Sequence, residues 1–221
     1  MRSSDGRHKV GCVVFPHIVG YTRLAIDFVR GRHRTFRKVE QSARRRKLEE
    51  RWSRSFPDAP ATGHLRDLFP ERWARFHTRG PHDAAFDIDA AKTLRSLLDE
   101  LSHERNWKVR MIVKEGGAGD FFSGWSKSIP ADFFPWRKSP ADEDGPAIYY
   151  WASGYVSPQA VNHALLKIVA EEGYAVFTDK KVTWAFCPYW AGVDIIFPST
   201  QERDDFVNTH RDLLSAHPSG L

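Results

Sequence analysis

Two segments of the chain repeat apolar residues at helical spacing and predict amphipathic helices. In residues 87–101 the apolar positions recur every three or four residues, and Asp87 is a suitable N-terminal cap. In residues 157–173 a second series follows Ser157-Pro158, a typical helix start. Each helix is expected to bury one face against the rest of the fold.

Three further segments predict helices with weaker patterns. Residues 39–52 have high helix propensity but a narrow apolar stripe, which is typical of a helix lying on a surface. Residues 64–69 predict a short helix ended by Pro70, and residues 200–214 predict a final helix with acidic residues near its start.

Short runs rich in β-branched and aromatic residues predict strands. An Asp-Lys-Lys turn joins two of these runs, 174–178 and 182–187, so they are expected to pair as a hairpin. Residues 116–146, rich in Gly, Pro and aromatics, are expected to form one long irregular connection. The predicted strands are 72–77, 109–113, 147–152, 174–178, 182–187 and 193–197.

The order of these elements favours an α+β fold. Helices and strands are mixed without a regular βαβ alternation, so we expect a single mixed or antiparallel sheet with helices packed mainly on one side. Residues 39–221 are predicted to form this one domain, and residues 1–38 a basic, poorly patterned N-terminal arm.

Charge separates the arm from the body. Residues 1–56 hold 15 Lys and Arg against 5 Asp and Glu, whereas residues 57–221 hold 18 against 23. The formal net charge of +5 therefore describes the N-terminal part of the chain. Because regular structure is predicted from Val39 onward, we hypothesise that synthesis starts there and that residues 1–38 are not translated.

The cysteine count, the hydropathy and the known catalytic motifs narrow the cellular location and the chemistry expected of this chain. The two cysteines lie far apart, and no apolar run is long enough to cross a membrane, so a cytoplasmic location is expected. The chain has no GxSxG, HExxH or EF-hand pattern, and its ten His lack metal-ligand spacing. We expect no metal site and no cofactor, and the sequence favours a non-enzymatic role.

One acid and two bases are the candidate catalytic residues. Asp194 lies inside an apolar strand, where a carboxylate is costly unless it is paired. Arg75 and His77 share one strand face and could meet a single anion or carboxylate. Either these residues form a catalytic pocket, or Asp194 is a structural partner of an arginine; the pattern favours the structural reading.

Aromatic and basic residues supply the candidate binding residues. Trp125 and Trp136 lie in the Gly- and Pro-rich segment, where aromatics either form a satellite core or present a partner-binding surface. Arg44-Arg45-Arg46-Lys47 could neutralise phosphates of a nucleic acid, or could be the solvated face of a surface helix.

Two stretches of the chain form distinctive motifs. The first motif runs from Phe56-Pro57 through Leu65-Arg66 to Arg72-Trp73-Ala74-Arg75-Phe76-His77, and the second is Tyr189-Trp190-Ala191-Gly192-Val193-Asp194. These motifs resemble a group of uncharacterised actinobacterial proteins known as domain of unknown function 3885. The resemblance covers residues 50–221 and implies a domain boundary but no activity. Thr78-Arg79 and Ala191 depart from the group's pattern. Arg72, Trp73, Tyr189 and Trp190 are the candidate binding residues within these motifs.

The leading hypothesis is a cytoplasmic bacterial protein that acts as a protein-binding or regulatory module. One alternative is nucleic-acid binding through the basic N-terminal arm. The other is an enzyme with a pocket formed by Arg75, His77 and Asp194. A protein partner is expected, and no membrane.

Overall fold

The structure is a computed structural model that describes most of the region expected to fold. The basic arm, Trp125 and the cap Asp87 lie outside the described residues. The described ranges are 43–61, 65–78, 88–102, 108–115, 133–139 and 148–214.

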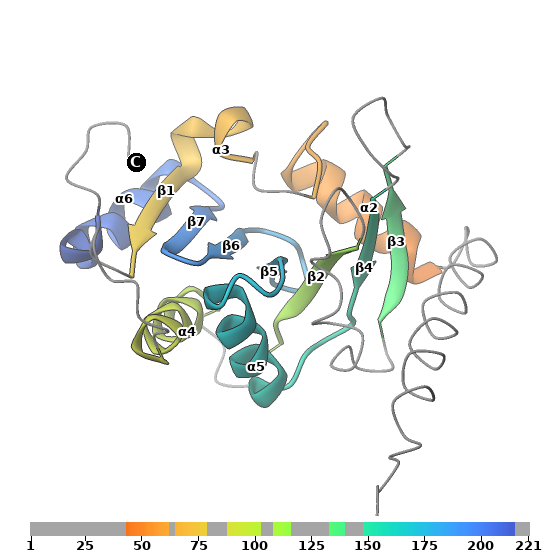
Figure 1. The fold of residues 1–221 in the computed structure, drawn as a ribbon. Coiled ribbons are helices and arrows are strands. Elements are labelled where there is room, and N and C mark those ends of the chain that lie inside the picture. The colour runs from red at the N-terminus through yellow and green to blue at the C-terminus, as the bar shows by residue number, and fades with distance from the viewer. Residues whose placement is uncertain are drawn as a thin grey trace, which may run out of the picture.

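Seven strands form one sheet in which every neighbouring pair is antiparallel (Figure 1). The strand order is β1-β7-β6-β5-β2-β4-β3. This arrangement confirms the predicted α+β class with a single antiparallel sheet, and the predicted hairpin of β5 and β6. The strands are β1 (Trp73–His77), β2 (Arg110–Glu115), β3 (Phe134–Lys138), β4 (Tyr149–Ala152), β5 (Ala175–Thr178), β6 (Ala185–Tyr189) and β7 (Gly192–Ile196).

In the described ranges, five α-helices pack against this sheet, three on one face and two on the other (Figure 1). The larger layer contains α4 (Ile88–Ser102), α5 (Pro158–Val169) and α6 (Thr200–Thr209). The opposite face carries α2 (Ala43–Ser55) and the single-turn α3 (Leu65–Leu68). Short 3₁₀ turns, η1 (Pro70–Arg72) and η2 (Arg211–Leu213), precede β1 and follow α6.

Alternation along the strands gives the sheet a separate hydrophobic core on each face. In β7, Val193 and Ile195 face the layer of α4, α5 and α6, whereas Ile196 faces α2 and α3. The core beneath α2 includes two fully buried tryptophans, Trp52 and Trp136, whose rings meet edge to face at 5.1 Å. Asp194 lies on this second face, between Val193 and Ile195.

The expected long connection over residues 116–146 is wrong in its second half, where the structure places the edge strand β3. Pro135 hid this strand from a pattern search, because proline lacks the N–H that a central strand must donate. Pro135 is tolerated here since β3 pairs only with β4, and a register shift lies between Pro135 and Arg137. Trp136 consequently belongs to the core.

Strands β1 and β7 approach each other so closely that one position between them requires glycine. A Cβ atom on Gly192 would lie 2.1 Å from the carbonyl oxygen of Phe76. The close approach fixes the register in which Arg75 lies opposite Asp194. No helix in the described ranges is both long enough and apolar enough to cross a membrane.

Candidate functional site

The predicted acid and bases meet at the end of the sheet formed by β1, β7 and β6. Trp73, Arg75 and His77 alternate along β1 and so project toward the face that carries α3. Asp194 of β7 is the cross-strand neighbour of Arg75 on one side and of Cys187 on the other. We call Trp73, Arg75, Tyr189 and Asp194 the paired corner.

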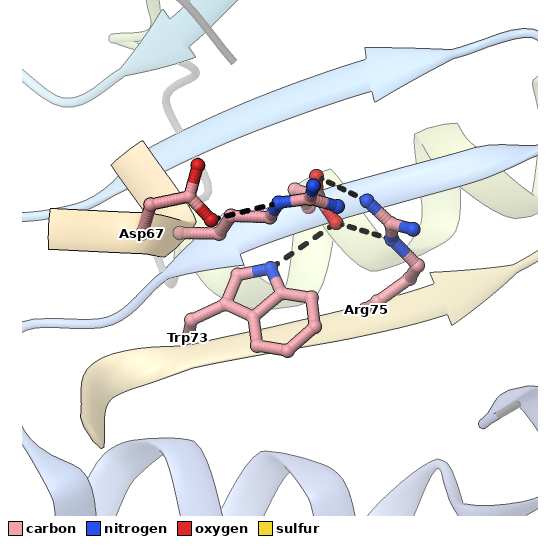
Figure 2. Close-up of polar contacts among 5 residues, drawn as sticks. Asp67, Trp73 and Arg75 are labelled. Atoms are coloured by element: carbon pink, nitrogen blue, oxygen red, sulfur yellow. Dashed lines mark hydrogen bonds and ion pairs between the residues drawn. The ribbon is translucent and has the colours of Figure 1, made fainter. Parts of the chain in front are cut away.

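Three donors occupy the carboxylate of Asp194 (Figure 2). Arg75 donates from Nε to Oδ1 at 2.7 Å and from Nη2 to Oδ2 at 2.9 Å, a bidentate ion pair. The indole Nε1 of Trp73 donates to Oδ1 at 3.1 Å. Because both partners are largely buried, this geometry is what makes the charges tolerable in the interior.

Aromatic rings enclose the guanidinium of Arg75. Its Cζ atom lies 5.6 Å from the ring centre of Trp73 and 5.3 Å from that of Tyr189. The hydrogen bonds to Asp194 raise the pKa of Arg75, although burial acts in the opposite direction. Burial raises the pKa of Tyr189 to about 12. The corner is therefore a rigid, neutralised assembly rather than a group of free acids and bases.

Cys187 and His77 border the paired corner without joining its hydrogen bonds. Burial raises the pKa of the Cys187 thiol well above its usual range, and the Asp194 charge adds to this effect, so the thiol stays protonated. Within the described ranges, no hydrogen bond joins His77 to Arg75 or Asp194, and its buried Nε2 has no partner there. The structure thus brings together two of the three proposed catalytic residues, and a catalytic role for them stays a prediction.

Helix α3 lies over the same corner. Its Asp67 accepts from Nε of Arg66 at 3.2 Å (Figure 2). Arg66 is close enough to Tyr189 for its charge to act on the phenol, opposing the effect of burial. The Leu-Arg of the first motif therefore serves two purposes, because Leu65 is buried in the core beneath α3 while Arg66 reaches the corner.

Arg72 clips together the segments that lead into β1. Its Nη2 donates to the carbonyl oxygen of Ser55 at 3.1 Å, and its Cζ lies 4.7 Å from the ring centre of Phe69. These contacts join the end of α2 to the 3₁₀ turn before β1. The predicted binding residue Arg72 is thus engaged within the protein.

The predicted aromatic binding residues have very different surroundings. Trp136 is fully buried and donates from Nε1 to Glu49, so a partner cannot reach it in this fold. Trp190, at the turn between β6 and β7, is 47% exposed. Tyr189 is partly buried beside Arg75.

Helix α2 carries an ion pair that the sequence patterns did not reveal. Arg137 of β3 donates from Nη2 to Oε1 of Glu49 at 2.6 Å and from Nε to Oε2 at 2.9 Å. Burial by itself would raise the pKa of Glu49, but the hydrogen bonds and charge of Arg137, with the Trp136 bond, lower it overall. This pair fastens α2 to the edge strand, and only the tertiary docking of α2 makes it visible.

The remaining candidates lie on the first turns of α2. Arg44, Arg46 and Lys47 are exposed, and Arg45 is partly buried. Arg46 forms a long, exposed contact with Glu50 at 3.8 Å. Across the described ranges, no group of three or more His, Cys, Asp or Glu side chains is placed to hold a metal ion.

Comparison with known proteins identifies the family. A search of curated proteins and a search of solved structures each gave no match. A family model described as a domain of unknown function (DUF3885) matches residues 62–218 and so includes every strand, α3 to α6 and all four residues of the paired corner. The chain therefore belongs to the DUF3885 family.

Proposed function

We propose that the protein is a binding module that recognises a partner protein at the β6–β7 turn, with Trp190 as its anchor. The observation that carries the proposal is a large aromatic side chain, 47% exposed, at the tip of a turn in a sheet. A solvent-exposed indole has an energetic cost that contact with a partner would remove.

The rigidity of the paired corner supports this role. Tyr189 and Gly192 pair across the turn, and Arg75 stacks on Tyr189 directly before Trp190. A fixed turn loses little conformational freedom on binding, which favours affinity. Trp, Tyr and Arg are also the residue types enriched among the side chains that dominate interface energetics.

The saturation of Asp194 favours binding over catalysis. A general acid or base must exchange a proton with its substrate, and this carboxylate already accepts three internal hydrogen bonds. The corner is better suited to hold the turn in place than to react.

A bacterial, actinobacterial cytoplasm is the proposed location. Cys187 is a free, buried thiol, which is compatible with a reducing compartment. The Arg-rich composition is compatible with a high-GC genome. A regulatory role through the bound partner follows if the partner has an activity of its own.

The test uses Trp190→Ala, with Tyr155→Ala as the matched control because Tyr155 is also an exposed aromatic, at 40%. Partners captured by the wild-type chain from its native host are identified, purified and titrated against each variant by calorimetry. Trp190→Ala is expected to weaken binding by about 30-fold, the loss of a central aromatic anchor. Tyr155→Ala should bind as wild type.

If the Trp190→Ala variant bound every captured partner with the affinity of the wild-type chain, the proposal would be contradicted. Unchanged melting temperatures of both variants would show that lost binding is not lost folding. Nucleic-acid binding is the second candidate, favoured by the exposed Arg44, Arg46 and Lys47. Titration with an oligonucleotide distinguishes nucleic-acid binding from partner-protein binding.

A further inference from the structure

A second buried arginine, Arg110 at the start of β2, has no acidic partner among the residues that the structure describes. The residue is only 8% exposed and lies on the sheet face that carries α2. Its Nη1 donates to the carbonyl oxygen of Ser153 at 2.9 Å, and its Nε is buried without any hydrogen-bond partner. Within the described residues, no carboxylate lies within ion-pair distance of its guanidinium.

Helix α2 brings further positive charge to this place. Arg51 donates from Nη1 to the carbonyl oxygen of Lys180 at 2.7 Å, which anchors the helix over the turn between β5 and β6. Thr178, the residue before that turn, is the cross-strand neighbour of Arg110. Burial lowers the pKa of Arg110, and the charge of Arg51 and, less strongly, of Arg44 lower it further.

The acidic and phenolic groups nearby do not neutralise this cluster. Asp179 and Tyr155 oppose the shift in the pKa of Arg110, but they act at a distance and do not cancel it. The carboxylate of Asp179 accepts the backbone N–H of Thr183 at 2.7 Å. Arg51 and Arg110 therefore keep excess positive charge around a largely buried guanidinium.

Such an arrangement is energetically unfavourable without a counter-ion. A guanidinium stays charged in proteins, and burying an unpaired charge costs several kcal/mol. The other largely buried arginine of this sheet face, Arg75, has a bidentate carboxylate. The missing negative charge at Arg110 is therefore expected to come from a ligand.

We propose that Arg51 and Arg110 form a binding site for a phosphate group, between α2 and the β5–β6 turn. Guanidinium groups bind phosphate through paired N–H···O hydrogen bonds. More than one cation matches the charge of a phosphate dianion better than it matches the charge of a single carboxylate.

The site goes beyond partner binding and lies away from the paired corner. The strands β7, β6 and β5 separate β1 from β2 in the sheet, so the two sites can be changed independently. Phosphate could come as the free ion or as the terminal group of a small phosphorylated molecule, and the two sources share this chemistry. A nucleic acid would instead use the exposed surface of α2.

The experiment titrates the full-length chain with inorganic phosphate, adenosine monophosphate and a single-stranded oligonucleotide, with sodium chloride at matched ionic strength as reference. Phosphate at a hundredfold excess over its dissociation constant is expected to raise the melting temperature by about 5 °C over chloride. Tighter binding of the monophosphate than of free phosphate would identify a phosphorylated small molecule as the source, and the reverse would identify the free ion.

Arg51→Gln is expected to weaken phosphate about tenfold, the loss of one charge-assisted contact. The matched control is Arg46→Gln, on the same helix but directed at Glu50, and it should bind phosphate as wild type. Arg110→Met should abolish the phosphate response while keeping or raising the melting temperature in phosphate-free buffer, because it removes an unpaired buried charge.

Three outcomes would overturn the proposal. One is equal stabilisation by phosphate and chloride in the wild-type chain. Another is an unchanged phosphate response in both Arg51→Gln and Arg110→Met. The third is tight oligonucleotide binding that Arg46→Gln weakens as much as Arg51→Gln does, which would assign the surface of α2 to nucleic acid.

Discussion

Arg75 and Arg110 project from the same face of one sheet, yet among the described residues only Arg75 is paired with a carboxylate. Arg75, on the edge strand β1, holds a carboxylate with two hydrogen bonds. Arg110, on the interior strand β2, donates to one backbone carbonyl and lies near Arg51, which is bonded to the β5–β6 turn. The pKa of the first is raised by its partner, and that of the second is lowered by burial and by like charge.

The difference follows from strand register rather than from local sequence. Both arginines alternate with apolar residues, but the neighbour across from Arg75 is Asp194 and the neighbour across from Arg110 is Thr178. A charged residue in a strand is thus stabilised or left unpaired by what the next strand supplies. The paired case builds the fold, and the unpaired case is the natural place to look for a ligand.

The largest expected effect comes from removing the carboxylate partner of Arg75, so that Arg75 resembles Arg110. Asp194→Asn removes the negative charge that pairs with the buried guanidinium of Arg75, so the free energy of unfolding should fall by about 3–5 kcal/mol. Urea denaturation measures the change. The control is Glu50→Gln, whose pair with Arg46 is exposed and should contribute less than about 0.5 kcal/mol. Similar losses in both variants would contradict the contrast between buried and exposed pairs.

An intermediate effect is expected for the half-buried pair of Glu49 and Arg137. Glu49→Gln should lower the free energy of unfolding by about 1 kcal/mol at neutral pH. The pKa of Glu49 is lowered from its ordinary value of 4.5, so its contribution is present above pH 4.5 and is lost as the pH falls through the folded-state pKa.

The measurement is urea denaturation of wild type and Glu49→Gln across the acidic range. The difference in stability between them should be constant near neutrality and shrink as the solution becomes more acidic than pH 4.5. A difference that grows on acidification would show that the carboxylate is not stabilised by Arg137.

The smallest effect comes from placing a carboxylate near Arg110, so that Arg110 resembles Arg75. Arg51→Glu replaces the positive charge near Arg110 with a negative one but also removes the hydrogen bond to the carbonyl oxygen of Lys180, so the free energy of unfolding should stay within about 0.5 kcal/mol of wild type. It should also remove the response to phosphate. Arg46→Glu, at an exposed site on the same helix, is the control and should not stabilise. A loss of stability in Arg51→Glu equal to that in Arg46→Glu would contradict the repulsion between Arg51 and Arg110.

The sequence predicted the parts of the fold that local patterns encode. The spacing of leucines gave α4, and Ser157 caps α5 by accepting the N–H of Ala160, as its position implied. Strand β3 escaped prediction because a proline and a register shift disguise an edge strand. The predicted helix over residues 200–214 ends as an α-helix at Thr209, and a 3₁₀ turn follows.

The candidate site was predictable only in part. The cost of a carboxylate in an apolar strand drew attention to Asp194, and its pairing with an arginine followed that expectation. Arg110 carries the same signal, a charge between Val109 and Met111 in a predicted strand. What no pattern supplies is the register beside it and the docking of α2, because both depend on contacts between distant segments.

The two edge strands of the sheet, β1 and β3, are hindered from pairing with a further strand in different ways. Along β1, Phe76 forms a β-bridge with Leu214, so the C-terminal segment covers part of the ladder. Along β3, Pro135 supplies no N–H and the strand is bulged. An eighth strand, from another copy of the chain or from an aggregating peptide, would find no uninterrupted row of donors and acceptors. Both features disfavour pairing of the described edge strands with a further strand.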